Sequence, residues 1–290
     1  MPRTFYFVAG EHSGDSRGVE LMEALRRRWP DCEFRGMGGP KMREISEGEV
    51  VDWVDEAAVV GLWEVLRKYS YFKTRLEEAK REVGRLDPDA LVLIDYPGFN
   101  LRLAKAVRAA GSGARIIDYI SPQVWAWKKG RVFEMAEYLD LMLCLFPFEV
   151  DHFERVGIST SCIGHPLVQQ LEAARLPGGR EEKLVGLFPG SREREVARLF
   201  PEMLKAAAVL RKRDPEIRFV AAAASDSLRE AMLNLADGRE GVEVRAGCAH
   251  QLMQQATAGV VASGTATLEA AYYGLPHCLV YKVAWPTYLA

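Results

Sequence analysis

The sequence predicts an α/β protein made of parallel β-sheets covered by helices. Short apolar runs alternate along the chain with segments whose apolar residues recur at helical spacing. The runs are continuously apolar, as is typical of strands covered on both faces. The chain has 290 residues, which is comfortable for two domains. We therefore expect two Rossmann-like, doubly wound domains with right-handed crossovers.

The expected elements follow one another as strand and helix. The first strand, "FYFVA", precedes the amphipathic segment "GDSRGVELMEALRRRW", and "LVGLFPG" similarly precedes "EVARLFPEMLKAAAVLRKR". The segment 164–183 holds two prolines and two adjacent glycines before a charge run, which is typical of a hinge. We expect domains at 1–166 and 167–290. The expected strands are 5–9, 33–37, 90–95, 115–120, 141–146, 161–164, 184–190, 217–223, 242–247, 259–263 and 277–282.

The overall composition excludes several classes of protein. The formal net charge of -2 gives no global footprint for nucleic acid. Five scattered cysteines form no CxxC pair, which argues against a zinc site or a disulfide framework. Residues 246–268 are uncharged, but His250 and three glutamines within them disfavour a membrane span and favour a helix, a buried strand and a loop. No signal peptide is visible, and we expect a cytoplasmic protein.

The turn after the first strand is one candidate ligand site, because ligands of open parallel sheets bind at the carboxyl ends of the strands. It reads "GEHSGD" and contains Glu11, His12, Ser13 and Asp15. Two glycines permit a tight turn, and Ser13 could cap the next helix. The alternative is an ordinary capped turn. The pattern is not GxGxxG, so a dinucleotide site is unsupported.

A carboxylate follows the expected strand 90–95, in "IDYPGFN". Asp95 and Asn100 flank Pro97 and Gly98. A carboxylate at the end of a strand can act as a general base on a hydroxyl. The alternative is that Asp95 forms a turn by bonding its own backbone.

Two loops of the second half are typical of nucleotide sites. In "LFPGSREREV", Ser191 and Arg192 stand where a helix begins, and free backbone N–H groups beside a guanidinium favour a diphosphate. In "ASGTATLEAAYYGLP", a hydroxyl-rich loop opens a helix, and a carboxylate one turn later can accept both hydroxyls of a ribose. The alternative for both loops is simple helix capping. The residues of the second loop are Ser263, Gly264, Thr265 and Glu269.

Aromatic and basic residues gather in two segments of the first half. Together they suit a lipid phosphate or a membrane interface. For the first of these segments, 59–72, the alternative is a helix that faces the core. It contains Leu62, Trp63 and Leu66, and the second, 119–135, contains Trp125, Trp127, Lys128, Lys129 and Arg131.

The motifs in this order resemble the lipid-A-disaccharide synthases, a family of inverting glycosyltransferases of lipopolysaccharide biosynthesis with two Rossmann-like domains facing across a cleft (the GT-B fold). The resemblance runs from residue 7 to the end of the chain. The co-linear set is specific, although each motif alone is weak. The matching motifs are "VAGEHSGD", "GMGGPKM", "VVGLWEVL", "LIDYPGFN", "YISPQVWAWKKGRV", "LFPFE", "IGHPL", "LFPGSREREV" and "ASGTATLEAAYYGLP".

The resemblance implies a reaction and its partners. The donor would be UDP-2,3-diacylglucosamine, the acceptor 2,3-diacylglucosamine 1-phosphate (lipid X), and the products a β(1→6) lipid A disaccharide 1-phosphate and UDP. Asp95 would be the general base, Arg192 a contact of the diphosphate or uridine, and 263–269 the nucleotide loop. The predicted residues of the acceptor side are Glu11, His12, Ser13, Asp15 and Asn100. No metal or other cofactor is expected. The enzyme would work as a peripheral protein on the inner face of the inner membrane, with closure about 164–183 excluding water.

The end of the chain departs from the family pattern, since related enzymes continue beyond residue 290. We expect an apparently truncated C-terminal domain with exposed apolar surface, weaker UDP binding, and instability or repair as a homo-oligomer. Two rival interpretations stay open. One is another UDP-sugar enzyme of the GT-B or epimerase type. The other is an inactive, membrane-associated relative.

Overall fold

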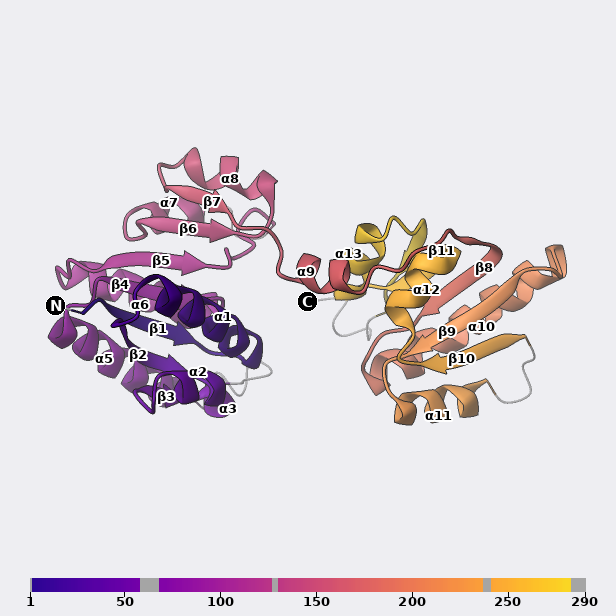
Figure 1. The fold of residues 1–290 in the computed structure, drawn as a ribbon, viewed down its shortest axis with the longest axis horizontal. Helices are drawn as coiled ribbons and strands as arrows, with labels where there is room; N and C mark the ends of the chain where they lie inside the picture. The colour runs from indigo at the N-terminus through magenta and orange to yellow at the C-terminus, as the bar shows by residue number, and fades with distance from the viewer. Residues whose placement is uncertain (1, 58–67, 127–129, 237–240, 283–290) are drawn as a thin grey trace. The chain divides into compact units, whose positions relative to one another are not determined.

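The chain folds into two compact units, which divide between His165 and Pro166. The computed structural model describes residues 2–57, 68–126, 130–236 and 241–282. Each unit is a parallel β-sheet with helices between successive strands (Figure 1). The predicted α/β class with two doubly wound halves is therefore confirmed.

Unit 1 contains a seven-stranded sheet in the order β3-β2-β1-β4-β5-β6-β7. The order reverses between β1 and β4, which pair in parallel from Phe5 opposite Ala90 to Ala9 opposite Ile94. Its strands are β1 (Thr4–Ala9), β2 (Glu33–Gly38), β3 (Val50–Asp52), β4 (Ala90–Ile94), β5 (Arg115–Tyr119), β6 (Leu141–Cys144) and β7 (Thr160–Cys162). Its helices are α1 (His12–Arg28), α2 (Pro40–Ile45), α3 (Val54–Ala57), α5 (Tyr69–Leu86), α6 (Pro97–Ala109), α7 (Arg131–Ala136) and α8 (Pro147–Glu154).

Unit 2 contains a five-stranded sheet in the order β10-β9-β8-β11-β12. All of its strand pairs are parallel, and β8 pairs with both β9 and β11. Its strands are β8 (Glu181–Phe188), β9 (Arg218–Ala223), β10 (Val242–Ala246), β11 (Ala256–Ala262) and β12 (His277–Val280). Its helices are α9 (Leu167–Ala173), α10 (Glu193–Arg213), α11 (Asp226–Leu235), α12 (Ala249–Gln255) and α13 (Thr265–Tyr272).

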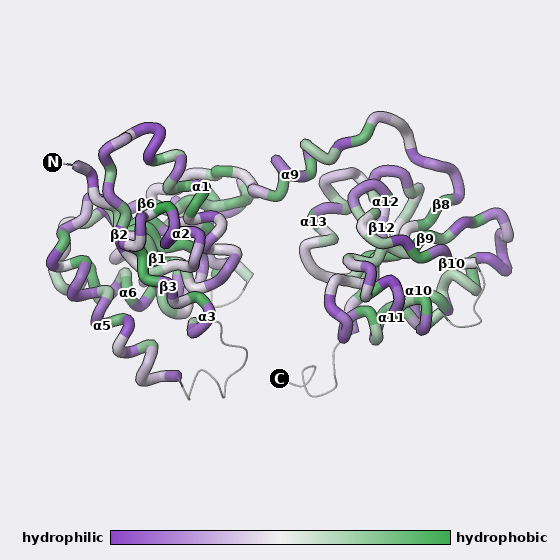
Figure 2. Tube along the Cα trace, turned by 60° about the horizontal axis from the view of Figure 1, so that its bottom comes forward, coloured by the Kyte–Doolittle hydropathy of each residue, from purple (hydrophilic) through white to green (hydrophobic). Residues whose placement is uncertain are grey.

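Apolar cores lie on both faces of each sheet. In β1, Tyr6 and Val8 belong to one core, whereas Phe5, Phe7 and Ala9 belong to the other. Unit 2 divides the residues of its sheet between two cores in the same way. The hydropathy colouring in Figure 2 shows the hydrophobic central strands of unit 1 among more hydrophilic helices. This two-sided burial explains the continuous apolar runs in the sequence.

All eleven predicted strands are present, and one further strand was missed. The missed strand, β3, has only three residues and pairs at the sheet edge with Gly36 to Gly38. Such a short stretch has no readable periodicity. Residues 246–268 form α12 and then β11, as predicted, and no helix among the described residues is long and apolar enough to cross a bilayer.

The segment predicted to be a hinge, 164–183, contains α9. Leu171 of α9 is buried in a core of unit 2, so this part of the segment belongs to that unit. Strand β12 lies at an edge of the sheet of unit 2. Its Leu279 is 57% exposed, and Tyr281, directly after the strand, is 69% exposed. The exposed apolar surface expected of a truncated domain stays a prediction, because residues 283–290 lie outside the described part of the chain.

Candidate active site

The turn between β4 and α6 has an unusual backbone. Asp95 and Tyr96 are consecutive residues with positive φ, 48° and 54°. Neither is glycine, and such residues cost on the order of 1–3 kcal/mol each unless their surroundings hold them. A carboxylate oxygen of Asp95 accepts a hydrogen bond of 2.8 Å from the backbone N–H of Tyr96. The turn bond offered as the alternative role of Asp95 therefore exists, and it fixes one oxygen of the carboxylate.

The side chain of Asn100 stabilises this turn through hydrogen bonds to its backbone. It is fully buried in α6, and its amide nitrogen donates to the carbonyl oxygens of Asp95 at 2.5 Å and Ile94 at 3.3 Å. Its amide oxygen is buried, and no described group donates to it. The predicted contact between Asn100 and the acceptor does not fit this burial. Asn100 instead positions the backbone of Asp95.

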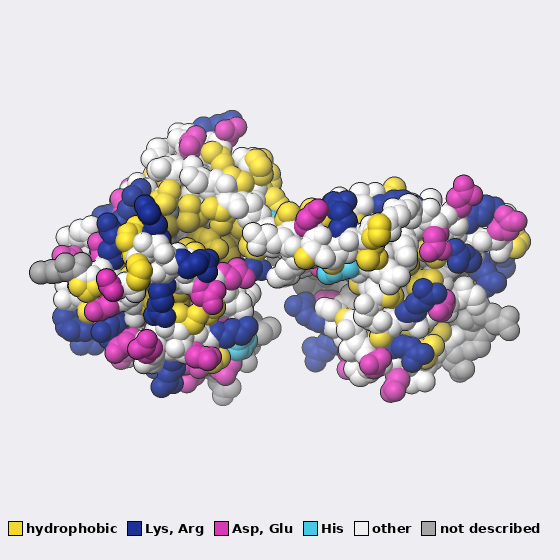
Figure 3. Space-filling view, in the orientation of Figure 1, with side chains coloured by type: hydrophobic (Ala, Val, Ile, Leu, Met, Phe, Trp, Pro, Cys, Tyr) yellow, Lys and Arg dark blue, Asp and Glu magenta, His cyan; other side chains and the backbone are white. Residues whose placement is uncertain are grey.

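A pocket of about 290 Å³ surrounds Asp95 at the carboxyl ends of β4, β5 and β6. Its walls include Ile120, Ser121 and Phe146. Ile120 also has a positive φ, 79°, which is a genuine outlier for a β-branched residue. In Figure 3, hydrophobic side chains gather on unit 1 over this part of the molecule. Backbone strain that clusters around one cavity is typical of a functional site.

Glu149 forms hydrogen bonds with two segments that line this pocket. It lies in the first turn of α8 and is 2% exposed. Its carboxylate accepts hydrogen bonds from the Ser121 hydroxyl at 2.8 Å and the Trp125 indole N–H at 3.1 Å. It also accepts from the backbone N–H groups of Leu145 and Phe146, at 3.2 and 3.0 Å. The sequence motifs contain Ser121 and Glu149, but we assigned neither a role, because only the folded chain brings them together.

Three carboxyl groups gather near the ends of β1, β4 and β5. Burial raises the pKa of Asp95, and the hydrogen bond from Tyr96 partly offsets this. Burial and the charge of Asp95 raise the pKa of Glu11. Asp118 is fully enclosed, and burial, together with Asp95, raises its pKa well above its usual range. Raised carboxyl pKa values in a cluster are typical of acid–base sites.

The turn "GEHSGD" differs from its predicted geometry. Helix α1 begins at His12, and Ser13 lies inside its first turn and caps nothing. Asp15 is buried, and its carboxylate accepts the backbone N–H groups of Gly39, Lys41 and Met42 at 2.9–3.1 Å. Asp15, predicted beside the acceptor, is therefore buried and bonded within unit 1 rather than open to a ligand. Its carboxylate caps the start of α2 instead.

Three other residues of this turn, Glu11, His12 and Ser13, are exposed. Glu11 precedes α1, and the imidazole of His12 lies 3.1 Å from the carboxylate of Asp55. All three stay candidates for acceptor contact.

Only part of the predicted lipid-facing surface can be compared with the structure. Trp125 is half-buried, its indole N–H is bonded to Glu149, and its ring packs edge-on against Phe148 at 5.1 Å. Arg131 is half-buried at the start of α7. The other predicted members lie outside the described residues: Leu62, Trp63, Leu66, Trp127, Lys128 and Lys129.

The predicted nucleotide residues of unit 2 line one pocket of about 440 Å³. It lies where the neighbouring strands β8 and β11 end, and Gly190 and Gly264 make its turns with φ of 109° and 152°. Arg192 stands immediately before α10, is largely exposed, and pairs with Glu195 at 2.9 Å. The structure brings together Ser191, Arg192, Ser263, Gly264, Thr265 and Glu269.

His250 is a further member of this pocket that the sequence did not single out. It lies in α12, and its imidazole is 3.7 Å from the carboxylate of Glu269. The sequence gives only a weak indication of a functional role for His250, because it is the one titratable histidine in an otherwise uncharged segment. Its neighbour Glu269 is half-buried one turn into α13, with its carboxylate directed to the same pocket.

The chain is similar to known proteins over nearly its whole length. The family model for lipid-A-disaccharide synthetase matches residues 5–289. A lipid-A-disaccharide synthase of Geobacter metallireducens is 42% identical over 291 residues, which cover 97% of this chain and 75% of the relative. That of Trichlorobacter lovleyi is 39% identical over 292 residues, covering 98% of this chain and 76% of the relative.

Solved structures support the fold alone. MurG of Acinetobacter baumannii aligns with a TM-score of 0.54 at 11% identity, covering 96% of this chain and 86% of that one. A UDP-GlcNAc 2-epimerase of Methanocaldococcus jannaschii aligns with a TM-score of 0.54 at 11% identity, covering 96% and 83%. On the family match over nearly the whole chain and the identity to its relatives, this chain belongs to the lipid-A-disaccharide synthase family.

Proposed function

We propose that this glycosyltransferase joins UDP-2,3-diacylglucosamine to 2,3-diacylglucosamine 1-phosphate, releasing UDP and a β(1→6) disaccharide 1-phosphate. Family membership supports the reaction. The observation that carries its assignment to residues is the placement of Asp95. Its carboxylate lines a pocket at the carboxyl ends of the strands, where the backbone adopts unfavourable positive φ angles. Burial raises the pKa of this carboxyl group.

Asp95 is the general base of the reaction. It accepts the proton of the acceptor's 6-hydroxyl as that oxygen bonds to the anomeric carbon of the donor. The bond from the anomeric carbon to the diphosphate breaks, and UDP leaves with the electron pair. A raised pKa makes the carboxylate a stronger base. The bond from Tyr96 and the support from Asn100 fix its direction.

The pocket of unit 2 stabilises the leaving UDP. Free N–H groups at the start of α10 and the guanidinium of Arg192 suit the diphosphate. The backbone at Gly264 can approach phosphate oxygens closely, because glycine tolerates its positive φ. Glu269 can accept the ribose hydroxyls. Unit 1 then binds the acceptor and unit 2 the donor nucleotide.

The enzyme acts at the inner face of the inner membrane, because both substrates carry acyl chains. The aromatic and basic segments 59–72 and 119–135 supply the membrane-facing surface. Changing Leu62 and Trp63 to Ser should weaken binding to anionic vesicles more than it weakens UDP binding. Equal loss of both would contradict a membrane role for this segment.

Incubation of the purified protein with both diacylated substrates tests the reaction. Disaccharide phosphate and UDP should form in equal amounts. The rival function, a different UDP-sugar enzyme, predicts that plain UDP-N-acetylglucosamine is used as well as the diacylated donor. That outcome, or release of UDP without disaccharide, would overturn the proposal.

A further inference from the structure

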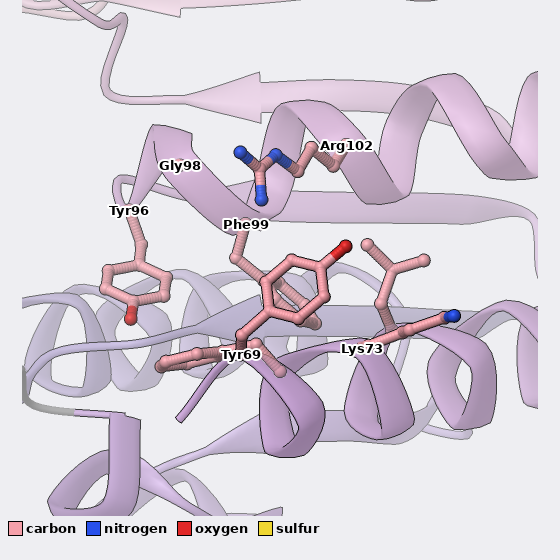
Figure 4. A pocket seen from close by; sticks show the side chains of 8 residues that line it. Tyr69, Lys73, Tyr96, Gly98, Phe99 and Arg102 are labelled. Atoms are coloured by element: carbon pink, nitrogen blue, oxygen red, sulfur yellow. The ribbon is translucent and has the colours of Figure 1, made fainter. Parts of the chain in front are cut away.

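Unit 1 has a second cavity, which the reaction above does not use. It encloses about 440 Å³ between α5 and α6, within the size range of small-ligand sites of about 300–1,000 Å³. Figure 4 shows Tyr69 and Lys73 rising from α5 and Phe99 and Arg102 extending from α6 around it.

The inner wall of the cavity is apolar and well supported. It is formed by Phe72, Leu76 and Phe99. The buried indole of Trp53 packs against both phenylalanine rings, with centroids 6.3 Å from Phe72 and 4.9 Å from Phe99. Phe72 and Leu76 lie one turn apart on α5, so they present one continuous face. Such a wall suits an apolar chain.

Two cations lie at the rim. Lys73 and Arg102 are both exposed and come from facing helices. No described carboxylate forms an ion pair with either of them, whereas their neighbours Arg75 and Lys105 each have an acidic partner. An apolar cavity whose two rim cations form no ion pair with a described carboxylate is complementary to an anionic lipid.

The cavity is a near neighbour of the proposed base. Tyr96 and Gly98 are part of its wall, and they follow Asp95 by one and three residues. Asp95 itself lines the other pocket of unit 1. A lipid in the cavity would therefore lie beside the turn that carries Asp95.

We propose that this cavity binds an acyl chain of the acceptor, while Lys73 and Arg102 bind the acceptor's phosphate. The inference rests on the proposed function, which supplies an acceptor with both groups. The donor is the weaker fit, since the candidate diphosphate residues all lie in unit 2.

Filling the cavity tests the acyl-chain site. A Cβ atom at Gly98 would meet no described heavy atom within 4 Å, and the residue is helical, so Gly98→Leu should fold and occupy the space. In the wild type, each buried methylene of the acceptor should improve kcat/KM about fourfold, from about 0.8 kcal/mol per CH₂. Gly98→Leu should flatten this dependence, with the largest loss for the longest chains.

Gly84→Leu is the matched control. Gly84 is also helical, exposed and free of neighbours within 4 Å, but it lies outside the cavity. This variant should keep the wild-type dependence on chain length. The same steep dependence in both variants would overturn the acyl-chain site.

The phosphate contact is tested separately by Lys73→Gln and Arg102→Gln. Each should raise KM about tenfold for the phosphorylated acceptor, the usual worth of one charge-assisted hydrogen bond. The change should be much smaller for an acceptor analogue without the phosphate. Lys105→Gln, on the same helix as Arg102, is the control for loss of one charge. Equal effects on both acceptors would overturn the phosphate contact, and thermal unfolding confirms that each variant is folded.

The wild type separates this inference from the proposed function. If it forms no disaccharide from any diacylated pair, the proposed function fails and the acyl-chain site falls with it. If it forms disaccharide but the Gly98 and cation variants behave as their controls, the acyl-chain site and the phosphate contact fail while the proposed function stands.

Discussion

At the scale of single residues, the carboxyl group of Asp95 decides the proposed chemistry. Asp95→Asn removes the base and keeps the shape, so kcat should fall by about 10²–10⁴. UDP binding should be unchanged, since the candidate nucleotide residues belong to unit 2. Steady-state kinetics and UDP titration measure the two effects. Asp55→Asn, which alters an exposed carboxylate, is the control, and near-wild-type turnover by Asp95→Asn would refute the assignment.

The rate should also depend on pH through the same group. Burial raises the pKa of Asp95, and only the ionised form accepts a proton. Activity should therefore rise with pH along an acidic limb whose midpoint lies above the ordinary carboxyl value of about 3.9. A profile of kcat against pH gives the midpoint, and the limb should vanish in Asp95→Asn. A limb that persists in this variant would assign it to another group.

Asp118 should affect the stability of the fold rather than the activation of the acceptor hydroxyl. It is 3% exposed, and its raised pKa keeps it protonated in the folded chain at pH values where the unfolded chain ionises. This group therefore lowers stability as pH rises above about 4. Asp118→Asn should raise the free energy of unfolding by about 1–3 kcal/mol at pH 7 and by less near pH 4. Denaturant unfolding at both pH values is the measurement, and a gain independent of pH would contradict the explanation.

At the scale of elements, one side chain joins α1 to α2. The three N–H groups that Asp15 accepts lie 24 to 27 residues further along the chain. Asp15→Ala should lower the free energy of unfolding by about 2–4 kcal/mol, because buried donors are left unpaired. Turnover per folded molecule should persist, as measured after correction for the folded fraction. Loss of turnover without any loss of stability would show instead that Asp15 takes part in the reaction.

The strands were more predictable from the sequence than the side-chain roles. Continuous apolar runs marked eleven strands, because burial on both faces leaves a local signature. Asp95 was visible as a carboxylate directly after such a run. The buried roles of Asp15 and Glu149 were not, because their hydrogen-bond partners lie far along the chain or are backbone groups. Ser13 was misassigned because α1 begins two residues earlier than a serine cap at this position would require.

At the scale of the whole molecule, nucleotide binding should stabilise the two units unequally. All candidate UDP contacts lie in residues 166–290. UDP at a hundred times its Kd should raise the unfolding free energy of unit 2 by about 2.7 kcal/mol. Hydrogen exchange with mass spectrometry should show slower exchange after β8 and β11. Equal slowing in the strands of unit 1 would contradict a nucleotide site confined to unit 2.

The carboxylate of Glu149 has a consequence for protein engineering. It receives hydrogen bonds from Ser121 and Trp125 after β5 and from the backbone of residues 145 and 146 after β6. Grafting a foreign segment over 120–126 would leave this enclosed carboxylate short of two donors unless the graft supplies a hydroxyl and an indole. Chimeras designed to change acceptor preference should therefore exchange 120–126 and 145–149 together, as one cassette.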